Sequence, residues 1–239
     1  MTADHIALNL AAVRARLERA ARAARRPPQD IRLVAISKTF PVDYVRAAAA
    51  AGQADFGENR VQEALQKIAG SADLSIRWHL VGHLQSNKAR RAATAFHCIH
   101  SVDSLDLLGR LDGAAAEAGA APELLVQVDL AAEPTKFGIP EPLVRPLFDA
   151  ELRAARLVGL MVLPPWAENP EEARPWFRRL RELRDRLGAD GIPPGRLREL
   201  SMGMSHDFEV AVQEGSTMVR IGTAIFGERP RAAATESTL

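Results

Sequence analysis

Short apolar runs alternate with longer amphipathic segments along most of the chain, and this alternation constrains the fold more than any other feature. Eight runs have the composition of buried β-strands, namely residues 31–37, 54–57, 76–81, 98–102, 124–130, 157–163, 197–202 and 217–221. Helical patterns separate the runs, and an amphipathic helix over residues 3–25 precedes the first one. Strands that alternate with helices form parallel sheets with right-handed crossovers.

The number of strand–helix units favours a closed barrel. Eight units in 239 residues match a single α/β domain of the (β/α)8 TIM-barrel type. An open, doubly wound sheet is the alternative that the same pattern allows. No break in composition divides the chain, so we expect one barrel over residues 1–228, with an extra N-terminal helix, and a flexible tail over residues 229–239.

Charge and cysteine content limit the kinds of binding partner and the cellular compartment that we expect for this protein. The 31 basic residues nearly balance the 30 acidic ones, so no charge excess points to nucleic acid or to an anionic membrane. No apolar run is long enough to span a bilayer. The single cysteine, Cys98, has no partner for a disulfide within the chain. We therefore expect a soluble cytoplasmic protein that binds neither nucleic acid nor membrane.

The first strand ends at Lys38, one of only four lysines in the chain. The carboxyl ends of barrel strands carry the ligand site. Lysine, unlike arginine, can lose its proton and attack a carbonyl carbon. Lys38 is therefore a candidate for covalent chemistry. The alternative is a lysine that extends from the strand end into water.

Glycines and hydroxyls follow the last two strands, where barrels often bind phosphate. Strand seven leads into Met202-Gly203-Met204-Ser205 and strand eight into Gly222-Thr223. Glycines let backbone N–H groups approach a phosphate, although they also serve ordinary tight turns. A lysine after the first strand, combined with this phosphate site, is the layout that would hold pyridoxal phosphate (PLP) as a Schiff base.

Arg220 precedes Gly222 by two residues, so both should lie on the same face of the eighth strand. Its guanidinium could reach the pyridine nitrogen of PLP. An arginine there disfavours a protonated nitrogen and leaves the ring a weaker electron sink. The alternative is an arginine paired with an acid such as Glu58 or Asp207.

Several motifs in the same order make the chain similar to the pyridoxal phosphate homeostasis proteins, whose barrel resembles the N-terminal domain of alanine racemase. The motifs cover residues 35–38, 56–63, 78–88, 100–104, 200–205 and 215–227.

The resemblance implies a role for each candidate residue. It makes Lys38 the Schiff-base lysine and Ser205, Gly222 and Thr223 the phosphate ligands, with Ser201 and Met204 close by. It places Arg220 at the pyridine nitrogen and Asn59 and His79 beside the cofactor. It assigns no metal ligand and no catalytic residue.

The resemblance also bears on activity. Alanine racemase has a second, all-β domain that supplies a catalytic tyrosine, and we expect this chain to lack that domain. Its only tyrosine, Tyr44, lies on the first crossover helix, whereas a racemase needs two acid–base groups. We therefore expect a monomeric PLP-binding protein of PLP homeostasis that carries, buffers or delivers the cofactor to PLP-dependent apoenzymes.

Two other functions stay open. The first is a minimal PLP-dependent amino-acid racemase, in which Lys38 is one base and His79, His83 or a water is the other. The second is an interaction protein that uses the barrel as a scaffold.

Overall fold

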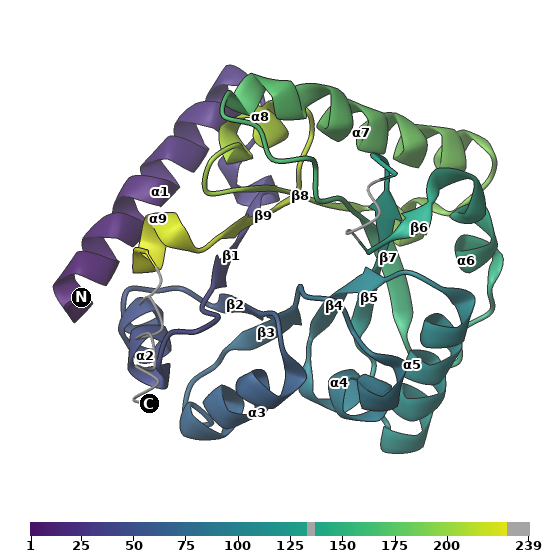
Figure 1. Ribbon diagram of the computed structural model, residues 1–239, viewed down its shortest axis with the longest axis horizontal. Helices are drawn as coiled ribbons and strands as arrows, with labels where there is room; N and C mark the ends of the chain where they lie inside the picture. Colours follow the sequence, from purple (N-terminus) through teal and green to yellow (C-terminus); the bar gives the residue numbers. More distant parts are fainter. Residues whose placement is uncertain (133–136, 229–239) are drawn as a thin grey trace, which may run out of the picture.

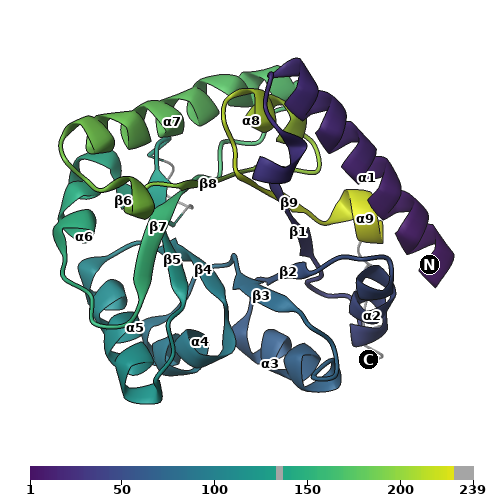
Figure 2. The ribbon, with the colours of Figure 1, turned by 180° about the vertical axis from the view of Figure 1, so that it is seen from behind.

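Eight parallel strands close into a barrel in the computed structural model, which describes residues 1–132 and 137–228. The strands are β1 (Arg32–Ile36), β2 (Asp55–Glu58), β3 (Arg77–Leu80), β4 (Cys98–Val102), β5 (Glu123–Asp129), β7 (Arg156–Met161), β8 (Glu199–Met204) and β9 (Met218–Ile221). Figure 1 and Figure 2 show the ring from its two ends. The expected flexible tail, residues 229–239, lies outside the described residues.

The pairing of the strands leaves no open edge in the ring. Strand β1 pairs with β2 on one side and with β9 on the other, and β4 pairs with β5. All the ladders are parallel, and the remaining neighbours follow in the order β9, β8, β7, β5. The predicted (β/α)8 barrel is therefore confirmed, and the open-sheet alternative is wrong.

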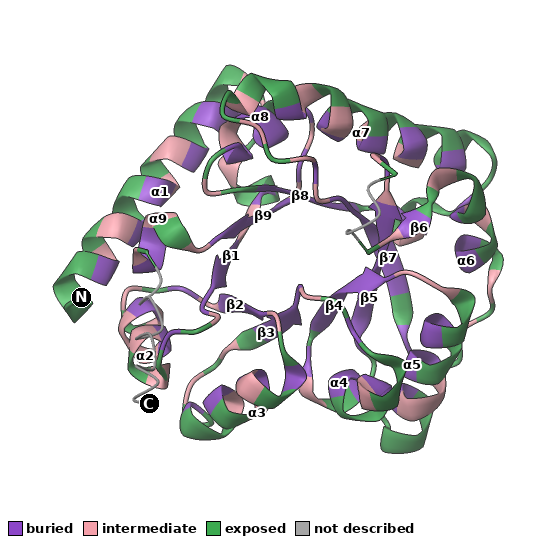
Figure 3. Cartoon of the chain, in the orientation of Figure 1, coloured by how far each residue is buried: buried purple, intermediate pink, exposed green. Residues whose placement is uncertain are grey.

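Helices form the outer layer of the barrel. They are α1 (Ala3–Ala23), α2 (Val42–Ala50), α3 (Val61–Gly70), α4 (Ala89–Ala95), α5 (Leu105–Ala118), α6 (Arg145–Asp149), α7 (Arg174–Ala189), α8 (Phe208–Gln213) and α9 (Thr223–Phe226). Figure 3 shows buried residues on the inner faces of these helices and exposed residues on the outer faces. Within the described residues, no helix combines the length and the apolar content that a membrane crossing requires.

The apolar core consists of one large cluster and two small ones, and alternate residues of a strand point to opposite faces of the sheet. On β1, Ala35 belongs to the large cluster between the strands and the helices. Its neighbours Val34 and Ile36 pack with Val81 in a separate, smaller cluster inside the barrel. The barrel interior is therefore a packed core that supports the residues at the strand ends.

The structure differs from the sequence prediction mainly near the later loops. Strand β8 runs on to Met204, beyond the predicted end at residue 202, and helix α8 begins at Phe208. The pairing of β8 with β9 shifts register between Ser201 and Met204, and Gly203 has φ +93°. A glycine bulge of this kind prolongs and bends a strand. The segment β6 (Ile139–Pro140), which pairs with β5, was not predicted.

Candidate functional site

A cavity of about 540 Å³ opens at the carboxyl ends of the strands. Seven of the nine predicted site residues line it, namely Lys38, Asn59, Met204, Ser205, Arg220, Gly222 and Thr223. They come from the ends of β1, β2, β8 and β9. The other two predicted residues, His79 and Ser201, are fully buried and do not line the cavity.

The charge of the cavity wall favours an anion. Lys38 and Arg220 bring basic groups, and none of the described lining residues carries a carboxylate. Leu163, Val81 and Ile36 supply apolar surface. The cavity therefore suits a ligand that combines a flat or apolar body with negative charge.

One end of the cavity is built from hydroxyls and backbone N–H groups. The Ser205 hydroxyl oxygen accepts hydrogen bonds from the backbone N–H groups of Gly222 at 3.2 Å and of Ala224 at 3.4 Å. These bonds hold the loop after β8 against the loop after β9. A Cβ at position 222 would lie 3.3 Å from the Ile36 carbonyl oxygen, so glycine gives the closest fit there. Ser205 and Thr223 both line the cavity, so their two hydroxyls can donate hydrogen bonds to a phosphate.

Arg220 is 4 % exposed and is one of the residues that line the cavity. Its Nη1 donates to the Ser201 hydroxyl at 2.6 Å, and its Nη2 donates to the Val162 carbonyl at 3.0 Å. Burial lowers its pKa to about 10, so the guanidinium stays charged at neutral pH. The predicted alternative partner Glu58 pairs instead with Lys67, at 2.7 Å. The charge of Asp207 favours the protonated form of Arg220.

A chain of hydrogen bonds continues from Arg220 through the barrel interior. Ser201 Oγ lies 2.8 Å from His100 Nδ1. His100 Nε2 lies 2.9 Å from His79 Nδ1, and His79 Nε2 lies 3.0 Å from Asp55 Oδ1. We call Asp55, His79, His100 and Ser201 the interior chain. His79 does not line the cavity. It is connected to Arg220, which does, through His100 and Ser201.

The charges along the interior chain fix the direction of its hydrogen bonds. Burial alone would raise the pKa of Asp55, but hydrogen bonds from Arg77 and His79 outweigh it and hold the pKa well below its usual range. Burial lowers the pKa values of His79 and His100. Both imidazoles are thus neutral and protonated on Nε2, so that His79 donates to the Asp55 carboxylate and His100 donates to His79 Nδ1. Each hydrogen bond of the interior chain is then donated in the direction that leads from Arg220 to Asp55.

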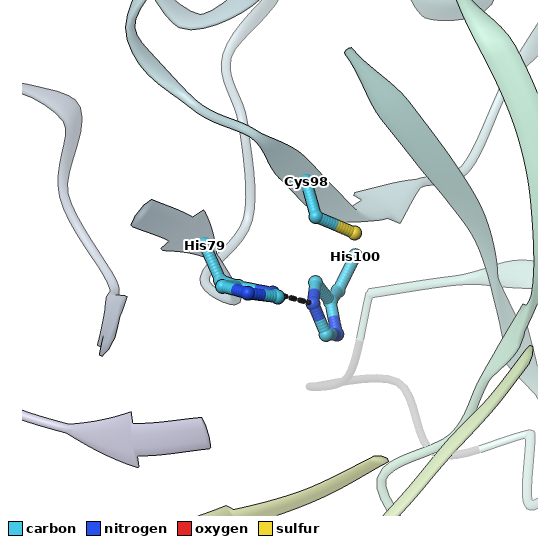
Figure 4. A group of neighbouring side chains, drawn as sticks. All are labelled: His79, Cys98 and His100. Carbon is cyan, nitrogen blue, oxygen red and sulfur yellow. Dashed lines mark hydrogen bonds between the residues drawn. The ribbon is translucent and has the colours of Figure 1, made fainter. Parts of the chain in front are cut away.

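The two histidines also lie near the only cysteine, as Figure 4 shows. Ligand atoms of His79, Cys98 and His100 all lie within 4.8 Å of one another, a donor set that zinc accepts. A metal would need the Cys98 thiolate, yet burial raises the pKa of this thiol well above its usual value. All four ring nitrogens of the two histidines already have hydrogen-bond partners. We therefore interpret the cluster as part of the interior chain.

Sequence reasoning missed Asp55 and His100. The sequence does place residues 98 and 100 on one face of a strand, but the register that pairs His79 with Cys98 is given only by the structure. The link to Asp55 depends on the pairing of β2 with β3, which has no local sequence signature.

Comparisons with known proteins agree with this fold. A family model described as alanine racemase, N-terminal domain, matches residues 8–230. The pyridoxal phosphate homeostasis protein of Pseudomonas aeruginosa is 46% identical, over 94% of this chain and 96% of that protein. That of Escherichia coli is 40% identical, over 95% of this chain and 97% of that protein.

Solved structures extend the comparison. PipY of Synechococcus elongatus with PLP bound has a TM-score of 0.83 and 42% identity, covering 93% of this chain and 100% of that one. An alanine racemase of Clostridium difficile shares the fold, with a TM-score of 0.69 and 15% identity over 95% of this chain and 57% of that one. The fold and site thus define a barrel of the alanine racemase N-terminal type. Within that class, the chain belongs to the pyridoxal phosphate homeostasis protein family.

Proposed function

We propose that this protein binds PLP in the cavity at the carboxyl ends of the strands. The observation that carries the proposal is the composition of the wall. A lysine, a buried arginine and a cluster of hydroxyls with backbone N–H groups meet there, with no carboxylate among the described lining residues. The PLP bound to PipY, at 42% identity, supports the same ligand.

The residues present fit this cofactor in size and in chemistry. A volume of about 540 Å³ lies within the roughly 300–1,000 Å³ usual for small-molecule sites. Ser205, Gly222 and Thr223 would hold the phosphate, and Ile36, Val81 and Leu163 would contact the ring.

When bound, PLP supplies an electrophilic aldehyde and an electron-withdrawing ring. The Lys38 amine, once unprotonated, would bind the aldehyde carbon with loss of one water. Arg220 would direct N–H donors at the ring nitrogen, which disfavours protonation of that nitrogen. The residues of this chain thus hold the cofactor without strengthening it as an electron sink.

We propose a role in PLP homeostasis rather than in catalysis because the candidates for a second acid–base group are poorly placed. His79 is fully buried within the interior chain. His83 stacks on Phe137 at 3.7 Å between ring centroids and is not among the residues that line the cavity. The Tyr44 hydroxyl accepts a hydrogen bond from the terminal amine of Met1.

The mouth of the cavity suits a cofactor that is released as well as bound. Trp166 and Met204, which line the cavity, are 81% and 37% exposed. We therefore propose that the protein buffers PLP or delivers it to PLP-dependent apoenzymes. We also propose that it is cytoplasmic and monomeric. Light scattering of the purified protein tests the monomer, and transfer of PLP to a purified apoenzyme tests delivery.

Titration of the apoprotein with PLP, followed by visible absorbance, tests the binding proposal. Wild type should form the band of lysine-bound PLP at one equivalent, and Lys38→Ala should not. A wild-type protein that forms no band would contradict the proposal.

Solvent deuterium exchange at the α-carbon of several amino acids tests the racemase alternative. We expect the PLP-loaded protein to catalyse no exchange. Exchange that disappears in Lys38→Ala would favour the racemase.

A further inference from the structure

Lys38 lies in a tight turn of unusual conformation. The Ser37 carbonyl accepts a hydrogen bond from the Phe40 N–H at 3.1 Å, so residues 37–40 form a β-turn with Lys38 at its second position. Thr39, at the third position, has φ +70°. Turns with a positive φ at this position normally take glycine or asparagine there. A β-branched residue in this region is an outlier, so other contacts must hold Thr39 in place.

Those contacts come from helix α3. Glu63 Oε1 accepts a hydrogen bond from the Thr39 backbone N–H at 2.6 Å. One helical turn further on, Lys67 Nζ donates to the Ser37 carbonyl at 2.7 Å. Helix α3 therefore fixes the turn on both sides of Lys38, at a carbonyl before it and at an N–H after it.

The two helix residues are themselves held in one ion cluster. Lys67 Nζ lies 2.7 Å from Glu58 Oε1 and 2.9 Å from Glu63 Oε1. With the Ser37 carbonyl, these acceptors satisfy all three N–H donors of the ammonium group. Glu58 is fully buried, and its Oε1 also accepts a hydrogen bond from the Ser37 hydroxyl at 2.6 Å. We call Glu58, Glu63 and Lys67 the turn clamp.

The clamp lies behind the turn rather than in the cavity. None of its three residues is among those that line the cavity, whereas Lys38 is. Lys67 is 6% exposed, so its ammonium group is committed to the clamp.

We propose that the turn clamp positions Lys38 for the aldehyde of PLP by keeping Thr39 in its left-handed conformation. This inference rests on the proposed function. Without the Glu63 carboxylate, Thr39 loses the acceptor for its N–H and can relax toward negative φ, which rotates the backbone that carries Lys38. Glu58, Glu63 and Lys67 are positioning residues, because they act on Lys38 only through the turn.

The test compares two ligands that differ only at the reacting carbon. PLP can bond to Lys38, whereas pyridoxine 5′-phosphate has the same ring and phosphate but an alcohol in place of the aldehyde. We expect Glu63→Ala to lower the preference for PLP over pyridoxine 5′-phosphate about tenfold, because the amine is loosened but not removed. The affinity for pyridoxine 5′-phosphate should stay unchanged, which general damage to the fold would not allow.

A second substitution tests the role of the strained turn. Glycine adopts positive φ at no steric cost, so Thr39→Gly combined with Glu63→Ala should restore the preference to within about threefold of wild type. Glu63→Gln keeps an acceptor for the Thr39 N–H and should retain most of the preference. Glu209→Ala is a matched control, because it removes a partly exposed carboxylate that pairs with Arg16 at 2.8 Å on another face. The preference should not change in this control.

Three results would overturn the inference. Glu63→Ala could keep the wild-type preference, it could weaken both ligands equally, or Thr39→Gly could fail to restore the preference. Failure of the proposed function looks different, because wild type itself would then show no preference for PLP. In that case the inference falls with the proposed function.

Discussion

Arg220 is the residue that connects the cavity to the barrel interior. It lines the cavity and also donates to Ser201 Oγ at the top of the interior chain. Among the described contacts, hydrogen bonds use two of its five N–H groups. The remaining N–H groups of Arg220 can donate to a ligand. The direction in which they point depends on Ser201 and Val162, which hold the guanidinium but do not line the cavity.

Ser201→Ala tests this dependence. The substitution removes the acceptor that lies 2.6 Å from Arg220 Nη1, and we expect the affinity for PLP to fall about tenfold, the order of a lost bond to a charged group. Isothermal titration calorimetry measures the change.

Ser216→Ala is the control for Ser201→Ala, since the buried Ser216 hydroxyl bonds only to backbone carbonyls, among them Met202 at 2.8 Å. It should lower stability and leave the affinity for PLP unchanged. Equal losses of affinity in the two variants would contradict a specific role for the interior chain.

At the scale of elements, the end of β8 shapes the site. The bulge at Gly203 carries the strand on to Met204, which lines the cavity, and brings Ser205 within reach of β9. A Cβ at position 203 would lie 2.6 Å from the Ala211 Cβ and 2.9 Å from the Phe208 Cα. Only glycine lets α8 pack this closely behind the strand.

Gly203→Ala should therefore lower the free energy of unfolding by about 2–4 kcal/mol, from the positive φ and the close contacts together. Gly109→Ala is the matched control, because Gly109 lies in α5 with no atom within 4 Å of an added Cβ. It should stabilise the protein by about 0.5–1 kcal/mol. Urea unfolding measures both changes, and equal effects would show that the bulge carries no strain.

The elements were predictable because their signals are local. Apolar runs located the eight barrel strands, and the strand numbers alone placed Lys38, Gly222 and Thr223 on one face. Helix ends also have local signals, as at α5, where the Ser104 hydroxyl oxygen accepts a hydrogen bond from the Leu107 N–H at 3.2 Å.

The features that could not be predicted from the sequence depend on contacts between residues that lie far apart along the chain. The interior chain joins residues from β2, β3, β4 and β8, which meet only when the barrel closes. The strained turn escaped notice because threonine, unlike glycine or asparagine, gives no sign of a positive φ. The resemblance implied that His79 lies beside the ligand, and in the structure its side chain is fully buried and hydrogen-bonded to His100 and Asp55.

At the scale of the whole molecule, the barrel holds ionisable groups in its interior, so its stability depends on pH. The pKa values of His79 and His100 are lowered by burial, whereas an unfolded histidine takes up a proton near pH 6.5. Below that pH, the unfolded chain binds more protons than the folded one. The free energy of unfolding therefore falls as the pH drops below about 6.5.

Urea unfolding at pH 7.5, 6.5 and 5.5 measures this loss of stability. The carboxyl groups of Glu58, Asp103 and Asp207 oppose this loss of stability. Burial raises their pKa values, so the folded protein takes up these protons more readily than the unfolded chain.

Nitrogen-15 spectra of the folded protein report the protonation of the histidine rings separately from that of the carboxyl groups. At pH 7.5 both buried rings should carry one proton, on Nε2. A doubly protonated ring, or a proton on His100 Nδ1, would contradict the assigned direction of the interior chain.

The attachment of PLP to Lys38 is the central claim, and reductive trapping tests it most directly. The PLP-loaded protein is treated with borohydride, digested and analysed by mass spectrometry, which identifies the modified lysine among the four in the chain. We predict one pyridoxyl group per chain, on the peptide that contains Lys38. Modification mainly at Lys67, Lys88 or Lys136, or no modification at all, would contradict the account.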